Sequence, residues 1–319
     1  MLAGEIGETY GQLRQEIAKK IIGQESIIEG LVVALISRGH ALMIGVPGLA
    51  KTLIVSTVSE ALELSFSRIQ FTPDLMPSDI TGTEILEEDE ETRVRRFHFM
   101  KGPIFSSMVL ADEINRTPPK TQAALLEAMQ ERKVTSSGKR YNLPDPFFVL
   151  ATQNPVEQEG TYSLPEAQLD RFMFSLNVGY PSEIDEFNIV RRTTSPENSV
   201  ITPIWNAQKV LSFQELVREI PVADNVIEFA VKLVRETRPE TTTNNQVKKF
   251  VTWGAGPRAS QYLILAAKAR ALLYGLNTPT SDDVAQIAYP ILQHRIITSF
   301  AAEAEGMTPE KIIDLLIKP

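Results

Sequence analysis

A stretch of eight residues, 45–52, constrains the fold of this chain more than any other part of its sequence. It consists of Gly-Val-Pro-Gly-Leu-Ala-Lys-Thr, follows a short apolar run at 41–44, and precedes a segment, 53–62, with apolar residues at helical spacing. A strand, a glycine loop, a Lys-Thr pair and a helix form the layout of a phosphate-binding loop. Backbone N–H groups and the helix dipole would attract phosphate, Lys51 would reach the β- and γ-phosphates, and the Thr52 hydroxyl would bind Mg²⁺.

One position departs from the usual G-x-x-x-x-G-K-[ST] pattern, because Ala50 stands where the last glycine is expected. If the backbone there has a positive φ, alanine has a steric cost that glycine avoids. If the residue already belongs to the helical turn, alanine is harmless. The sequence leaves both possibilities open, and it also leaves open an ordinary turn between a strand and a helix.

A second motif lies some sixty residues further on, where the apolar run 108–111 ends in Asp112 and Glu113. The run has the composition of a buried parallel strand, and ligands of open α/β sheets bind at the carboxyl ends of such strands. Asp112 is therefore a candidate for the Mg²⁺ shell, and Glu113 is a candidate to accept a proton from an attacking water. The alternative is an ordinary strand that ends in polar residues.

Two further candidates follow predicted elements downstream. Asn154 comes after a predicted strand at 147–151, and its amide could orient water against a γ-phosphate. Arg171 comes at the end of a predicted short helix within 164–172. Asn154 could equally be a turn residue before proline, and Arg171 could simply be a cation that complements a helix dipole.

Two further segments lie between these motifs. Residues 72–86 begin with many turn formers and indicate a functional or insertion loop, and the acidic residues 87–91 indicate a hairpin tip before a strand at 94–99. A helix is predicted at about 119–131. Residues 134–141 then predict a β-hairpin whose tip, 136–140, carries Lys139 and Arg140.

The pattern changes at Pro181, which we take as a domain boundary between residues 1–181 and 182–319. A helix is predicted at 25–38, and further strands are predicted at 65–71 and 172–178 before the boundary. After it the sequence is mainly helical, most clearly at 214–220, 225–238, 258–274 and 281–295. A glycine turn delivers Arg258 to the first turn of one helix, where a cation opposes the dipole. That placement slightly favours a functional arginine over a solvated one.

Composition limits the function classes. The chain has 319 residues, no cysteine and only three histidines, which argues against a disulfide framework and against a histidine-based metal site. Residues 1–10 lack the apolar core of a signal peptide, and no apolar run approaches the length that spans a bilayer. We therefore expect a soluble, cytoplasmic protein. The net charge of −8 argues against a dominant nucleic-acid surface.

These motifs, taken in order, resemble those of AAA+ ATPases and more closely those of the MoxR family. The resemblance covers nearly the whole chain and rests on residues 45–52, 111–122, 151–155, 159–162, 164–172 and 253–260. It implies a P-loop α/β core, made of a parallel sheet flanked by helices, followed by a smaller all-helical lid. The family tolerates alanine before the lysine, so Ala50 fits the resemblance.

The resemblance also implies a role for each matching residue. Asp112 and Glu113 look like Walker B, Asn154 like sensor 1, Arg171 like an arginine finger that acts on the neighbouring subunit, and Arg258 like sensor 2. Thr52 and Asp112 would hold Mg²⁺. The ATP-binding residues it implies are Ile22, Gly23, Gln24, Gly45, Val46, Pro47, Gly48, Leu49, Ala50, Lys51, Thr52, Leu53 and Asp112. The role of Arg116 and that of the 72–86 loop stay unassigned.

The function implied is Mg²⁺-dependent ATP hydrolysis by a hexameric ring, coupled to chaperone-like remodelling or activation of partner proteins. The family further implies clients with von Willebrand factor A domains. One alternative is a nucleotide-dependent binding switch with little turnover, although Glu113, Asn154 and Arg171 are all present. Another is a nucleic-acid motor, which only the basic hairpin tip favours. A third, an ATPase acting on a small molecule, lacks a second catalytic constellation.

Overall fold

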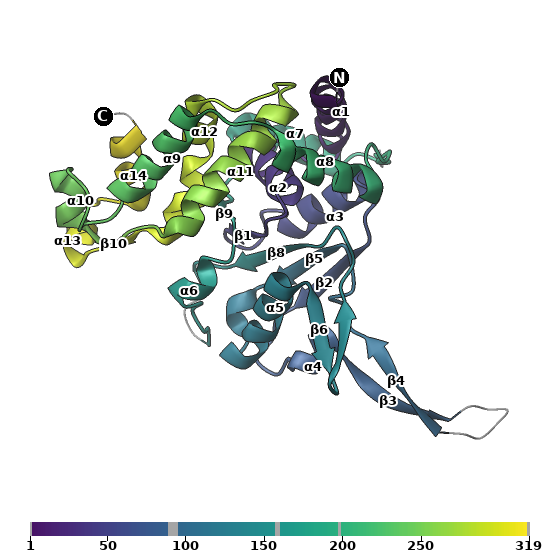
Figure 1. Ribbon diagram of the computed structural model, residues 1–319. Coiled ribbons are helices and arrows are strands. Elements are labelled where there is room, and N and C mark those ends of the chain that lie inside the picture. The colour runs from purple at the N-terminus through teal and green to yellow at the C-terminus, as the bar shows by residue number, and fades with distance from the viewer. Residues whose placement is uncertain (1, 89–94, 157–159, 197–198, 318–319) are drawn as a thin grey trace.

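The computed structural model describes residues 2–88, 95–156, 160–196 and 199–317. Its centre is a five-stranded parallel sheet in the order β2-β5-β8-β1-β9 (Figure 1). The strands are β1 (Ala41–Ile44), β2 (Phe66–Gln70), β5 (Met108–Asp112), β8 (Phe148–Gln153) and β9 (Phe174–Asn177). All five lie where strands were predicted, and their parallel pairing confirms the predicted α/β core.

Alternate side chains of the central strands enter two separate cores, as the period of two in a strand requires. Met43, Leu110 and Leu150 belong to a large core shared with helices on one face. Leu42, Val109 and Val149 belong to a smaller core on the other face. The helices of this part of the chain are α1 (Leu2–Ile17), α2 (Glu25–Ile36), α3 (Lys51–Ala61), α4 (Pro77–Thr81) and α5 (Pro119–Glu131).

The chain after β9 is mainly helical, as predicted. Its elements are α7 (Glu183–Thr193), α8 (Ala207–Glu219), α9 (Asp224–Glu236), α10 (Asn245–Phe250), α11 (Pro257–Leu273), α12 (Ser281–Leu292), η2 (Gln293–Arg295), α13 (Phe300–Ala304) and α14 (Pro309–Ile317). One detail was missed: β10 (Val251–Trp253) and β11 (Ile297–Thr298) form a small antiparallel pair. Such short strands carry too few residues for a periodic signal.

The insertion at 72–86 is more regular than the sequence indicated. After a turn, residues 77–81 form α4, and β3 (Gly82–Glu88) pairs with β4 (Arg95–Lys101) in a hairpin that projects from the body (Figure 1). The prediction of an irregular loop was therefore wrong beyond residue 76, because the turn formers Pro77, Ser78 and Asp79 begin a helix there and a ladder begins at Gly82. Residues 89–94, which include most of the predicted acidic tip, lie outside the described residues.

The second insertion is the predicted β-hairpin, made of β6 (Lys133–Ser136) and β7 (Lys139–Asn142). Its turn is Ser137-Gly138, where both φ angles are positive. Lys139 and Arg140 lie in the returning strand rather than at the tip, which corrects the predicted basic tip. The short elements η1 (Ile114–Arg116) and α6 (Glu166–Leu169) complete the core.

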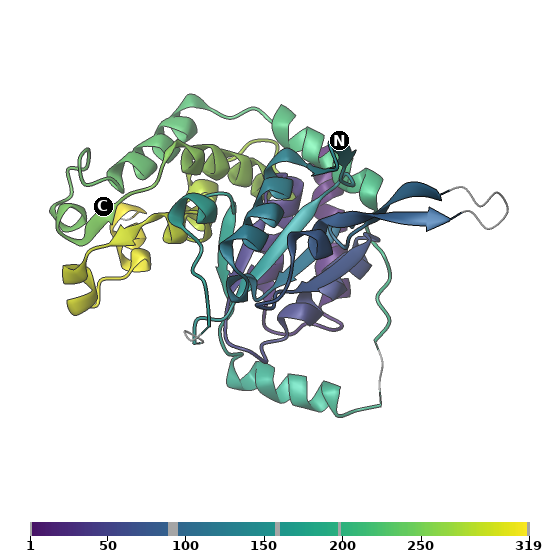
Figure 2. The same ribbon diagram turned by 90° about the horizontal axis from the view of Figure 1, so that it is seen from below.

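Helix α7 follows the predicted boundary and stands at the edge of the molecule (Figure 2). Its start is capped by Ser182, whose side chain accepts a hydrogen bond from the Asp185 N–H. No side chain of α7 is buried, and Ile184 and Phe187 are exposed. Further on, α1 and α11 pack against each other, so the two predicted domains share the larger core. None of the described helices is long and apolar enough to cross a membrane.

The segment between α7 and α8 is fixed to the core by Trp205. Its side chain is buried, its ring meets Phe213 edge to face at 4.9 Å, and the Ile204 N–H donates to the Ala61 carbonyl at 2.8 Å. The chain therefore returns to α3 before the lid helices begin.

We expect Trp205→Ala to lower the free energy of unfolding by about 3–5 kcal/mol, because it removes a large buried side chain and leaves a cavity. The other tryptophan, Trp253, is 65% exposed, so Trp253→Ala is the matched control and should change stability by less than about 0.5 kcal/mol. Urea unfolding followed by circular dichroism measures both. Equal losses for the two variants would contradict this account of the linker.

Candidate active site

The predicted phosphate loop joins β1 to α3 at the carboxyl end of the sheet. The Gly45 N–H donates to the Gln153 carbonyl at 3.2 Å, and a Cβ at position 45 would lie 2.9 Å from the Val178 carbonyl oxygen. Glycine is therefore required at 45 by close backbone approach. At Gly48 the reason differs, since its φ of +87° is a conformation that other residues rarely adopt.

The structure answers the question that the sequence left open at Ala50. This residue has φ 54° and ψ 23°, the left-handed conformation, directly before α3. Alanine therefore bears the steric cost that glycine would avoid. The residue also makes no side-chain cap for α3, so the first N–H groups of the helix have no side-chain acceptor. Such an uncapped helix start suits an anion.

Lys51 is the first residue of α3, and its ammonium group folds back over the loop. Its Nζ donates to the Gly45 carbonyl and lies 3.4 Å from the Val46 carbonyl. Burial lowers the pKa of Lys51, while the nearby carboxylates of Asp112 and Glu113 oppose this shift. The lysine thus lies where the phosphate loop and the end of β5 meet.

Asp112 ends β5 and is held from both sides. The Thr152 hydroxyl donates to Oδ1 at 2.6 Å, and Arg68 donates to Oδ2 from Nε at 3.0 Å and from Nη2 at 2.7 Å. The carboxylate is buried, and these partners compensate the charge that burial would otherwise penalise. Its orientation is therefore fixed by the strands on each side of β5, because Arg68 is on β2 and Thr152 on β8.

Glu113 follows immediately and has a left-handed backbone, with φ 59°. Its N–H donates to the Thr152 hydroxyl at 2.8 Å. Its carboxylate oxygen Oε2 accepts from Gln70 Nε2 at 2.9 Å and lies 3.2 Å from Arg116 Nε. Gln70 and Arg116 thus hold the Glu113 carboxylate in one position.

Asn154 follows β8 and is buried, with its Oδ1 accepting from the Val156 N–H at 3.1 Å. Strand β8 lies between β1 and β5 in the sheet. The asparagine is therefore placed between the phosphate loop and Glu113. Lys51, Thr52, Asp112, Glu113 and Asn154 thus come together at the carboxyl end of the sheet.

The segment Ile22, Gly23 and Gln24 lies beside α7. A Cβ at Gly23 would meet the Asp185 carboxylate at 2.6 Å, and Ile22 lines a cavity of about 640 Å³ together with Arg191 and other residues of α7. Strand β9 ends at Asn177, and the chain continues through Val178, beside Gly45, into α7. The cavity therefore belongs to the same end of the molecule as the phosphate loop, and its volume is typical of a small-ligand pocket.

Arg171 and Arg258 lie elsewhere. Both line a cavity of about 320 Å³ that Arg38, Arg132 and Arg218 also line. Residues 38–40, which line it too, directly precede β1, whereas the phosphate loop directly follows β1. The arginine-lined cavity is therefore at the amino end of the sheet, and the structure does not bring Arg171 or Arg258 to the Walker residues of the same chain.

Each of these two arginines has a partner. Arg171 Nη1 donates to the Leu126 carbonyl at 2.9 Å, and Arg258 Nη1 pairs with Asp170 Oδ2 at 2.9 Å. Burial lowers the pKa of Arg132 in the same cavity, with Asp145 opposing this shift and Arg38 and Arg218 adding to it. The cavity wall thus concentrates positive charge that a bound anion would neutralise.

Comparisons with known proteins agree with this geometry. Residues 40–174 match a family model described as "ATPase family associated with various cellular activities (AAA)", and residues 244–316 match a model described as "AAA lid domain". Chaperone MoxR1 of Mycobacterium tuberculosis is 43% identical, and the alignment covers 99% of this chain and 83% of that protein. The chain belongs to the MoxR family of AAA+ ATPases.

Other similar proteins cover the chain as fully. Protein YeaC of Bacillus subtilis is 40% identical over 95% of this chain and 91% of its own length. A crystal structure of a protein from Cytophaga hutchinsonii superimposes with a TM-score of 0.91 at 39% identity, over 99% of this chain and 95% of that one. This MoxR-family protein therefore has the AAA+ fold, an α/β core with a helical lid, along its whole length.

The residues of this MoxR-family site fit a nucleotide. The uncapped start of α3 and the two glycines of the loop form a cradle for phosphate, and Lys51 adds a cation beside it. The Thr52 hydroxyl and the Asp112 carboxylate would supply oxygen ligands to Mg²⁺, which prefers oxygen. As an AAA+ ATPase, the protein binds and hydrolyses ATP.

Sequence reasoning missed the residues that orient the two carboxylates, namely Arg68, Gln70 and Thr152. Arg68 and Gln70 are two apart on β2, so they share one face of the strand, next to the residues that end β5. That alternation was a weak signal in the sequence. The strand order that makes it meaningful, with β2 and β8 on either side of β5, could not be derived from one sequence.

We expect Ala50→Gly to raise the free energy of unfolding by about 0.5–1 kcal/mol, because glycine relieves the left-handed strain by more than it adds chain entropy. The matched control is Ala61→Gly in the last turn of the same helix, which should lower stability by about 1 kcal/mol. Denaturant unfolding without nucleotide measures both. A loss of stability in Ala50→Gly would contradict strain at this position.

Proposed function

We propose that this protein is a Mg²⁺-dependent ATPase that works as a ring, by family resemblance a hexamer, with each hydrolysis site shared between two subunits. The observation that carries the proposal is the division of the machinery between two ends of one sheet. Lys51, Asp112 and Glu113 lie at the carboxyl end, and Arg171 and Arg258 line a cavity at the amino end.

Within one subunit, the carboxyl end supplies binding and proton transfer. Backbone N–H groups of the loop and Lys51 hold the phosphates, while Thr52 and Asp112 hold Mg²⁺, which when bound neutralises charge on the phosphate oxygens. Glu113, held by Gln70 and Arg116, takes a proton from the attacking water. Asn154 orients that water. Ile22, Gly23 and Gln24 lie against the base of the nucleotide.

The arginines are proposed to complete the site of the neighbouring subunit. The four residues of β1 separate the two ends of the sheet by roughly 13 Å at the usual rise of a strand, which is longer than an arginine side chain. Arg258 therefore acts in this proposal on the neighbour's phosphates together with Arg171, instead of on the nucleotide of its own chain. A cation placed at the leaving phosphate in this way typically accelerates hydrolysis by about 10³–10⁵-fold.

We propose that the projecting β3–β4 hairpin contacts the client protein. It exposes large apolar side chains, with Phe97 71% and Leu86 53% accessible, which suits contact with a polypeptide. The family resemblance favours partner proteins with von Willebrand factor A domains, and a cytoplasmic location. The hairpin β6–β7 carries less free positive charge than its sequence indicated, since Lys139 lies 3.9 Å from Glu84. This weakens the alternative of a nucleic-acid motor.

Because the proposed site is shared, turnover per subunit should rise steeply with protein concentration. Arg171→Ala should lower turnover by about 10³-fold or more while leaving nucleotide binding intact. The matched control is Arg235→Ala, an exposed arginine of α9. A phosphate-release assay over a range of concentrations measures these rates, and equilibrium titration with a fluorescent nucleotide measures binding.

Measurable turnover that is independent of concentration and of Arg171 would refute the shared site. Undetectable turnover of the wild-type protein at every concentration would instead favour the nucleotide-dependent binding switch. In that case nucleotide binding would still respond to Lys51→Ala, since this variant removes the cation from the phosphate loop.

A further inference from the structure

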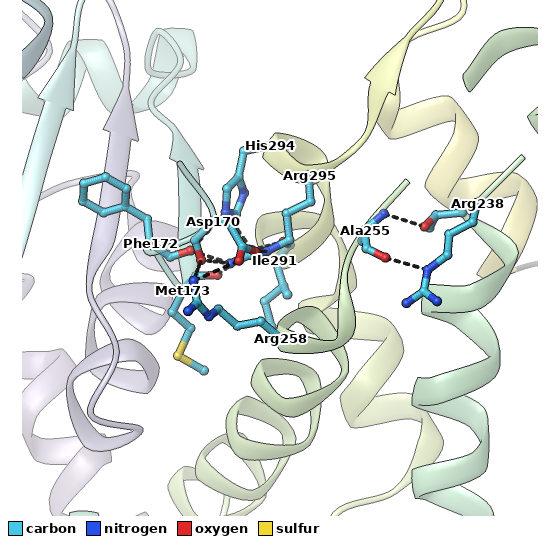
Figure 3. A network of polar contacts seen from close by, with 10 residues as sticks. Asp170, Phe172, Met173, Arg238, Ala255, Arg258, Ile291, His294 and Arg295 are labelled. Atoms are coloured by element: carbon cyan, nitrogen blue, oxygen red, sulfur yellow. Dashed lines mark hydrogen bonds and ion pairs between the residues drawn. The ribbon is translucent and has the colours of Figure 1, made fainter. Parts of the chain in front are cut away.

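One side chain of the lid, Arg295, is buried against the segment that carries the proposed arginine finger (Figure 3). Its guanidinium donates to Asp170 Oδ1 at 2.8 Å and to the backbone carbonyls of Asp170, Phe172 and Met173 at 3.0, 2.7 and 3.3 Å. It also donates to the Ile291 carbonyl of the preceding helix α12. The side chain is only 2% exposed, so these acceptors are what compensates its buried charge.

The acceptors lie on both sides of Arg171. Asp170 precedes it, and Phe172 and Met173 follow it, so Arg295 fixes the backbone from which the finger projects. Arg171 itself lines the arginine-lined cavity, where its Nη1 donates to the Leu126 carbonyl. Arg295 therefore fixes the backbone position of Arg171. None of the described contacts joins the two guanidinium groups.

A second element of the lid grips the same segment. Arg258, in the first turn of α11, pairs with Asp170 Oδ2 at 2.9 Å, so Asp170 joins two lid arginines (Figure 3). Tyr262 of α11 lies under Arg295, with 5.2 Å from the guanidinium carbon to the ring centroid. His294 Nε2 lies 3.1 Å from the Phe172 carbonyl oxygen. The lid thus holds this segment from α11 and from η2 together.

We propose that Arg295 is a positioning residue for Arg171, and that it makes the lid and the finger of one subunit move as a unit. The inference rests on the shared site proposed above. A lid that shifts without this segment would leave a buried cation without its acceptors, which is strongly unfavourable. A lid movement is therefore transmitted to the neighbouring subunit's nucleotide, whose hydrolysis depends on where the finger lies.

The first test is Arg295→Lys, which keeps the charge but cannot make the same forked set of hydrogen bonds. At a protein concentration where wild-type activity has reached its plateau, kcat should fall about 10- to 100-fold, as expected for a displacement of a catalytic group by about 1 Å. Nucleotide affinity should stay unchanged, because the phosphate loop of the same chain is intact. The matched control is Arg238→Lys, since Arg238 donates to the Ala255 carbonyl within the lid alone (Figure 3).

Mixing two kinds of variant subunit distinguishes a positioning role of Arg295 from a purely structural one. Arg295→Lys has an intact phosphate loop and a misplaced finger, whereas Lys51→Ala has a defective loop and an intact finger. Equimolar mixing should therefore restore activity well above that of either variant. The reference is the mixture of Arg171→Ala with Lys51→Ala. In this mixture too, one variant has an intact phosphate loop and the other an intact finger.

Each outcome has one meaning. If the reference mixture recovers activity and the Arg295→Lys mixture does not, Arg295 acts within its own subunit and the inference is wrong. Wild-type activity in Arg295→Lys alone would also overturn it. If the reference mixture fails as well, the shared site itself fails. If Arg295→Lys does not fold, Asp170→Asn replaces it in every arm, because it weakens the acceptor that both lid arginines use.

Discussion

The parallel pairing of β1, β5 and β8 is the constraint on which the rest of this molecule depends. It places the carboxyl ends of three strands side by side. The phosphate loop, Asp112 and Asn154 therefore meet at that end of the sheet, although they are far apart in the sequence. The same strand direction places the segments that precede β1 and β9 at the amino end of the sheet, where arginines line a cavity. A subunit built this way has a site at each end, and the proposed hydrolysis needs both.

The lid contacts the segment that carries the arginines. Buried polar contacts of Arg295 and Asp170 tie it to the segment before β9, while the larger apolar core continues from α2 into α11. Partnered buried charges contribute little net stability, but they fix one geometry because any other leaves a charge unpaired. In the proposed shared site, Arg295 can therefore affect catalysis although none of its described contacts is with the phosphate loop of its own chain.

Much of this was predictable from the sequence, because residues 45–52 and the run ending in Asp112 and Glu113 carry local signals of strand, turn and helix. Strands such as β1 and β5 followed from short apolar runs, and most lid helices followed from helical periodicity. The sequence could not predict that Arg68 and Thr152 hold Asp112, since that depends on which strands are neighbours. Nor could it place Arg258, whose position depends on how the lid packs on the core. Whether Ala50 is strained could be decided only from its backbone angles.

The most direct test of the shared site is a structure of the assembled Glu113→Gln variant with ATP and Mg²⁺, in which hydrolysis is slowed and the nucleotide stays bound. The account predicts that the guanidinium groups of Arg171 and Arg258 from one subunit lie within about 3 Å of the phosphate oxygens of a nucleotide held by Lys51 of its neighbour. An assembly in which Arg258 contacts the nucleotide of its own chain, or in which Arg171 reaches no phosphate, would contradict it.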